Sequence, residues 1–171
     1  MKTMFKLRFF FGFLLLAGVI CFFINFYRTK YYSGEMDDIN ALKQRFVQYD
    51  NIPYFKTDGK LFFAERVVQP YHTIEILGVF SDSLEDFKSN EEILDFSEEH
   101  IGETFFDDIL DHVPDHILHE YDFIRKVDDR YSMVDNGNEL HRYWFKTRWV
   151  QHGLLYLEHK TGKFMLRLSC R

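Results

Sequence analysis

The chain has 171 residues, a formal net charge of −6, and a content of 46% hydrophobic and 19% aromatic residues. This composition excludes a wholly disordered chain, and two cysteines are too few for a disulfide scaffold. The excess of acidic side chains excludes a general nucleic-acid-binding protein, because nucleic acids attract basic surfaces.

An uncharged, apolar segment of 18 residues runs from Phe9 to Phe26. As a helix it would be about 27 Å long, close to the roughly 30 Å of a membrane's hydrocarbon core. The sequence therefore predicts a transmembrane helix over residues 9–27, after a tail over residues 1–8. A cleaved secretory signal is the alternative interpretation, although no clear cleavage site follows the segment.

The basic residues around this segment predict its orientation. Three basic side chains precede the segment and two follow it, and residues 1–30 contain no acidic side chain. By the positive-inside rule, the amino terminus lies in the cytoplasm. The sequence thus predicts a single-pass protein of the cell membrane, with a linker over residues 28–34 and an extracytoplasmic domain over residues 35–171. In a Gram-negative bacterium this domain would be periplasmic.

The first part of the predicted domain contains a helix followed by strands. Apolar residues at helical spacing predict a helix over residues 35–49. The dipeptide Asp58-Gly59 favours a tight turn, which predicts a hairpin over residues 54–68. Alternating apolar and polar residues then predict a strand over residues 71–80.

The middle of the domain is predicted to be helical and its carboxyl-terminal part to be strands. Asn90 precedes Glu91 and Glu92 as an N-cap would, and an apolar stripe predicts two helical pieces that end near Asp111 or Pro114. Helices and strands segregated in this way predict an α+β domain with a mainly antiparallel sheet and helices on one face. The predicted final strands cover residues 121–127, 130–134, 140–150, 154–159 and 164–169.

Histidine, aspartate and glutamate side chains cluster between residues 111 and 120. Imidazole and carboxylate groups at this density suit zinc or another divalent ion. Pro114 interrupts the helix that would place His112 and His116 on one face. One interpretation of the chain needs no cofactor. The alternative is a metal-dependent enzyme or a metal sensor that binds a divalent ion in this region. Its candidate ligands are His112, Asp115, His116 and His119.

Charge is the most informative remaining feature of the domain. Residues 82–122 contain 15 acidic side chains and one basic one, whereas residues 139–171 contain seven basic and two acidic ones. The acidic segment predicts either a solvated surface or a surface that docks a basic partner. The candidate contacts for such a partner are Glu91, Glu92, Glu98, Glu99, Asp107, Asp108 and the aromatic Trp144.

Together these patterns predict a membrane-anchored, non-enzymatic protein-binding domain. An immunity-type protein that neutralises an effector, or an accessory subunit of an envelope complex, would have such a layout. The interpretation relies on architecture and charge alone, because no motif in the sequence names a reaction.

Overall fold

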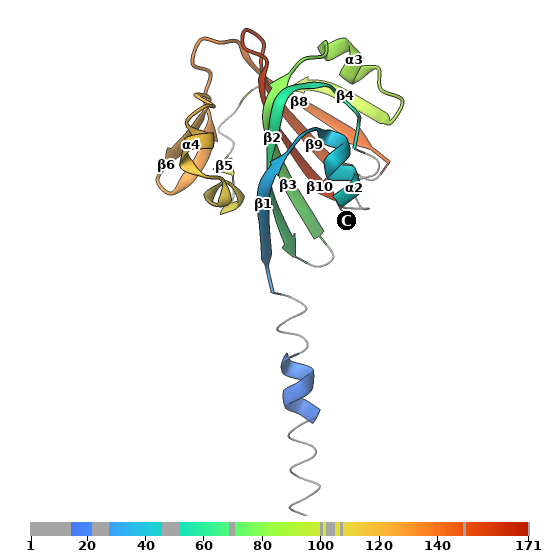
Figure 1. Ribbon diagram of the computed structural model, residues 1–171, viewed down its shortest axis with the longest axis vertical. Coiled ribbons are helices and arrows are strands. Elements are labelled where there is room, and N and C mark those ends of the chain that lie inside the picture. Colours follow the sequence, from blue (N-terminus) through green and yellow to red (C-terminus); the bar gives the residue numbers. More distant parts are fainter. Residues whose placement is uncertain are drawn as a thin grey trace, which may run out of the picture.

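The computed structural model describes residues 15–21, 28–45, 52–68, 71–99, 101, 105–106, 108–148 and 150–170 (Figure 1). Strands hold 52% of these residues and helices 20%. Seven antiparallel strands form the main sheet in the order β1-β2-β3-β10-β9-β8-β4. Its strands are β1 (Lys30–Met36), β2 (Thr57–Val68), β3 (Tyr71–Phe80), β4 (Ile93–Glu99), β8 (Leu140–Thr147), β9 (Val150–Glu158) and β10 (Lys163–Cys170).

Smaller elements cover the two faces of this sheet. A three-stranded antiparallel sheet in the order β5-β7-β6 forms a second layer. Figure 1 shows it beside α4 on one side of the main sheet, with α2 and α3 on the other side. These elements are α2 (Ile39–Arg45), α3 (Leu84–Lys88), β5 (Phe105–Phe106), the 3₁₀ helix η2 (Asp108–His112), α4 (Asp115–Leu118), β6 (Ile124–Val127) and β7 (Arg130–Met133).

Each face of the main sheet has its own hydrophobic core, as the alternation of side chains along a strand requires. Under α2 and α3, aromatic rings meet at close range, with Phe55 packed against Phe80, Phe87 and Phe164. On the opposite face, Leu77, Tyr156 and Met165 of the sheet pack with residues of the second layer. The buried second-layer residues are Ile109, Leu110, Val113, Tyr121, Phe123, Tyr131 and Met133.

Local sequence explains the short elements between the strands. The side chain of Ser83 accepts a hydrogen bond from the backbone N–H of Asp86, and the carboxylate of Asp86 accepts one from the backbone N–H of Ser83, so a capping box begins α3. Asp128 and Asp129 both have positive φ angles, of 48° and 60°. Two such residues between paired strands form a type I′ turn, whose twist suits the β6–β7 hairpin.

The strand predicted over residues 71–80 is confirmed, and the strands predicted over residues 154–159 and 164–169 fall in β9 and β10, which pair as the carboxyl-terminal hairpin. The predicted helix over residues 35–49 is shorter, because its first residues pair with β2 in strand β1. Residues 46–51 of that prediction lie outside the described residues. The predicted hairpin at Asp58-Gly59 is instead an irregularity within the single strand β2, where Gly59 has a φ of 73°.

The predicted α+β fold, with a helical middle and helices on one face, is wrong. Residues 93–99 form strand β4, because they pair with β8 along one edge of the main sheet. Phe96 lies opposite Phe145 in the register and contacts Phe87, whereas Leu94 is 64% exposed. Pairing with a strand that is distant in the sequence therefore overrode the local helical pattern.

The prediction of a transmembrane helix over residues 9–27 is contradicted. The described helix in this segment covers residues 15–21, and the rest of the predicted segment lies outside the described residues. Within the described ranges, no helix is long and apolar enough to cross a membrane. The single-pass anchor, its topology and the extracytoplasmic placement of the domain lose their support with it.

Candidate functional site

The predicted partner-binding residues fall in two places in the structure. Glu91 and Glu92 form the turn before β4, and Glu98 and Glu99 lie on β4 itself. Asp108 begins η2 in the second layer. Asp107 lies outside the described residues, as does the side chain of Asp108. The structure thus gathers four of the predicted carboxylates at one edge of the main sheet.

Two of these carboxylates pair with the basic strand β8. Oε1 of Glu98 lies 2.5 Å from Nδ1 of His141, and Oε2 of Glu99 lies 2.9 Å from Nη2 of Arg142. Both contacts cross from β4 to its neighbouring strand. The basic carboxyl-terminal strands therefore neutralise part of the acidic segment, as expected when unlike charges lie opposite one another on paired strands.

The amino-terminal half of the β4 region keeps its negative charge. Glu91 and Asp95 are exposed, and no ion pair joins either of them to a cation in the described part of the chain. Asp95 lies opposite Lys146 in the register without forming such a pair. Glu92 is half-buried, and its backbone N–H donates to the side chain of Asn90 at 3.0 Å. Glu91 and Asp95 therefore present carboxylates that no ion pair engages within the described residues.

In the second layer, the carboxylate of Asp111 is engaged by neighbouring side chains. Oδ1 of Asp111 accepts hydrogen bonds from Nζ of Lys126 at 2.7 Å and from the hydroxyl of Tyr131 at 3.0 Å. The hydrogen bond from Lys126 holds the pKa of Asp111 below its ordinary value. Asp111 therefore ties η2 to the β6–β7 hairpin, which is a structural role.

Sequence reasoning missed a group of titratable side chains beside Glu98. The rings of His141 and His159 lie 4.5 Å apart between their centroids, and the Tyr143 hydroxyl lies 2.7 Å from Nε2 of His159. His141, Tyr143, His159 and Glu98 together are called the histidine cluster below. Alternation along residues 141–145 places His141 and Tyr143 on one face, but only the sheet pairing brings Glu98 and His159 to them.

The environment of the histidine cluster shifts two pKa values. Burial lowers the pKa of His159, and the neighbouring His141 lowers it further, while Glu98 and Glu139 act in the opposite direction. Burial raises the pKa of Tyr143 to about 12, and Glu98 contributes to the same effect. Near neutral pH the phenol of Tyr143 therefore keeps its proton.

Trp144 lies on β8, on the face opposite to the histidine cluster. It pairs with Ser97 of β4 and is half-buried. Its indole N–H donates to Nδ1 of His152 at 3.1 Å. The tryptophan is therefore next to the acidic edge, as a partner-binding residue would be, but it does not share a face with Glu98.

The predicted metal ligands do not converge. The ring of His112 stacks on Tyr31 of β1 with 3.9 Å between centroids, whereas Asp115, His116 and His119 are exposed at α4. Among the described residues, no three His, Cys, Asp or Glu side chains lie where they can hold one ion. The metal hypothesis therefore has no assembled set of ligands in this part of the chain.

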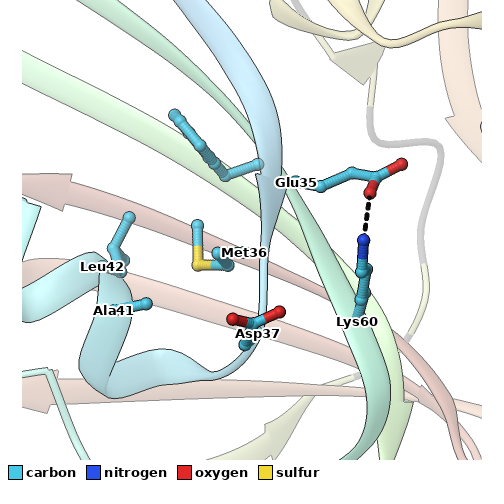
Figure 2. Close-up of a pocket in the computed structure, with 7 residues that line it drawn as sticks. Glu35, Met36, Asp37, Ala41, Leu42 and Lys60 are labelled. Atoms are coloured by element: carbon cyan, nitrogen blue, oxygen red, sulfur yellow. Dashed lines mark hydrogen bonds and ion pairs between the residues drawn. The ribbon is translucent and has the colours of Figure 1, made fainter.

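A pocket of about 250 Å³ lies at the other edge of the main sheet, where β1 leads into α2 (Figure 2). Nζ of Lys60 lies 3.0 Å from Oε2 of Glu35, and this hydrogen bond raises the pKa of Lys60. Figure 2 shows that pair on one side of β1, with Met36 and Leu42 on the other side. The charged groups therefore pair with each other rather than facing the apolar wall. The lining residues are Glu35, Met36, Asp37, Ala41, Leu42, Lys60 and Phe63.

No known protein family matches this chain, and no match was found among curated proteins or solved structures. At β4 and β8, the described residues combine a sheet edge that no described strand covers, exposed carboxylates outside ion pairs and a histidine cluster.

Proposed function

We propose that this chain is a non-enzymatic protein-binding domain whose β4 edge docks a basic partner. The acidic β4 surface consists of Glu91, Glu92, Asp95, Glu98 and Glu99. The observation that carries the proposal is that exposed Glu91 and Asp95 have no cation at ion-pair distance within the described residues. An immunity-type protein that neutralises a basic effector is one instance of this class.

Carboxylates outside ion pairs also occur near α4, but those at β4 lie along an edge of the main sheet, and this combination supports docking at the acidic β4 surface. In the second layer, Asp111 is already engaged by Lys126. At β4, an incoming Lys or Arg side chain can approach Glu91 and Asp95 without displacing an existing cation of the described chain. Charges that are free in this way raise the rate of encounter and select a partner of complementary charge.

A matched pair of charge reversals tests the proposal on the full chain. The first variant carries Glu91→Lys, Asp95→Lys and Glu98→Lys at the acidic β4 surface. The control variant carries Asp115→Lys, Glu120→Lys and Asp122→Lys, three exposed carboxylates of the same acidic segment near α4. Figure 1 shows α4 and β4 on opposite sides of the domain, so both variants change the net charge equally but at different places.

The probe is a displayed library of random peptides selected on the immobilised parent chain. We expect enrichment of Lys- and Arg-rich peptides whose binding weakens with salt. The β4 reversal should weaken their binding by about tenfold or more, and the α4 reversal should weaken it by less than about threefold. Unfolding midpoints check that both variants fold. Equal losses in the two variants, or selected peptides without positive charge, would show that the acidic β4 surface is only a solvated face.

A further inference from the structure

Strand β4 ends the main sheet, and no described strand pairs with its outer side. Such a strand presents a row of backbone N–H and C=O groups to solvent, which is a template for another strand. β4 pairs with β8 in an uninterrupted register from Asp95 opposite Lys146 to Glu99 opposite Arg142. Five consecutive residues of this edge are therefore straight enough to template a neighbour.

Apolar groups lie beside this edge as well as charges. Leu94 is 64% exposed and sits where the register shifts between Ile93 and Asp95. Phe96 is half-buried and stacks on Tyr143 with 5.4 Å between ring centroids. A strand laid against β4 would cover both side chains and gain apolar contact in addition to backbone hydrogen bonds.

We infer that the partner segment binds by adding to β4 as an extended strand with basic side chains on both of its faces. The inference rests on the proposed function and specifies its mode of binding. Side chains alternate along β4, so Glu98 projects from one face while Asp95 and Glu99 project from the other. An added strand with Lys or Arg on both faces meets a carboxylate on each side.

The same charges determine which occupant the edge accepts. Pairing of β4 with β4 of a second copy would bring Glu98 and Glu99 close to the same carboxylates, and like charges on paired strands repel. The edge strand β1 offers less charge complementarity, because it contains both Lys30 and Glu35. Its Tyr31 is also stacked on His112. A basic segment of another protein is therefore the occupant that fits.

Acidic side chains and a bulge also blunt edge strands against aggregation. If that were their only role at β4, the edge would not accept a strand. The two interpretations differ in whether the backbone of a basic peptide contributes to binding. Strand addition forms backbone hydrogen bonds, whereas repulsion of strands and attraction of charges act through side chains alone.

The test uses the full chain and two synthetic peptides. The first peptide contains pairs of adjacent lysines separated by valine and threonine. One lysine of each pair then lies on each face of the extended chain. The second peptide has the same side chains but methylated backbone nitrogens, which removes the hydrogen-bond donors and keeps the charge. Affinity for each peptide is measured with the parent chain and with the variant Glu91→Lys/Asp95→Lys/Glu98→Lys. Amide hydrogen exchange of the parent chain is followed with and without peptide.

We expect the unmodified peptide to bind the parent chain at least about tenfold more tightly than the methylated one. Exchange should slow at those amides between Phe96 and Glu99 whose N–H groups point away from β8, and remain unchanged at the amides of β1. The charge-reversed variant should lose binding to the unmodified peptide.

Other results overturn specific parts of the argument. Equal binding of both peptides, lost in the charge-reversed variant, would overturn strand addition and leave the proposed function standing. Binding that survives the charge reversal would overturn the proposed function. No binding of either peptide would overturn strand addition. Slower amide exchange at β4 as the concentration of the chain alone rises would also overturn it, because the occupant would then be a second copy.

Discussion

The hydroxyl group of Tyr143 and Nε2 of His159 share a hydrogen bond of 2.7 Å. The bond joins the middle of β8 to the turn that follows β9. It connects a buried phenol to a largely exposed imidazole, at the place where His159 also meets His141. Two predictions depend on this relationship.

The first prediction concerns pH. His159 has a lowered pKa in the fold, so the unfolded chain takes up its proton first as the pH falls through about 6.5. The stability that neutral His159 contributes is therefore complete above about pH 6.5 and is lost as the pH falls toward the folded pKa. His159→Gln should reduce this loss by a few tenths of a kcal/mol, because the ring is largely exposed and screened.

Urea unfolding of the parent and the variant at about pH 8 and about pH 5.5 measures this effect. His119→Gln is the control, since His119 is exposed after α4 and lies outside the histidine cluster. Equal changes in the two variants would contradict a specific role for His159.

The second prediction concerns the coupling between Tyr143 and His159. A double-mutant cycle with Tyr143→Phe and His159→Ala should give a coupling free energy of about 0.5–1.5 kcal/mol at pH 8 or so, because each single change removes the same hydrogen bond. The free energy of unfolding is measured for all four proteins. Strict additivity would mean that the bond contributes nothing to stability.

The third prediction concerns Gly153, which lies directly under the ring of Phe145. A Cβ atom at Gly153 would lie 2.3 Å from that ring, whereas one at Gly34 would lie 3.5 Å from Phe63. Gly153→Ala should therefore destabilise the fold by about 1–3 kcal/mol, and Gly34→Ala by less than about 0.5 kcal/mol. Phe145→Leu should make the Gly153→Ala change less costly in the double variant. Thermal or urea unfolding measures the change in the free energy of unfolding. Similar losses of stability at both glycines would refute the close contact.

The fourth prediction concerns the hairpin turn between β6 and β7. Asp129 has a φ of 60°, which costs an aspartate more than a glycine. Asp129→Gly combined with Asp128→Asn creates the Asn-Gly dipeptide that type I′ turns prefer and should stabilise the fold by about 0.5–1 kcal/mol. Asp122→Gly, in a turn without positive φ at that residue, should not stabilise it. A midpoint of unfolding that falls in the Asn-Gly variant would show that the turn is of another type.

The sequence predicted the elements whose formation depends on neighbouring residues. Residues 71–80 alternate, and they form β3. In the carboxyl-terminal hairpin, Gly162 has a φ of 73° and its N–H donates to the carbonyl of Glu158 at 2.8 Å, as a tight turn requires. Alternation along β8 also puts Tyr143 and Phe145 on one face, where both are buried. Patterns with a period of two residues are readable because alternate side chains of a strand lie on opposite faces of the sheet.

Only the tertiary structure decided what the acidic middle of the chain becomes and what its carboxylates meet. Residues 93–99 have helical spacing, but pairing with β8 makes them an edge strand. That pairing brings Glu98 to His141 across 43 positions of sequence, and Glu99 to Arg142. The sequence by itself determined that residues 82–122 are strongly acidic and that residues 139–171 are basic. It could not determine which charges neutralise each other, because long-range strand pairing follows from packing of the whole core rather than from local propensity.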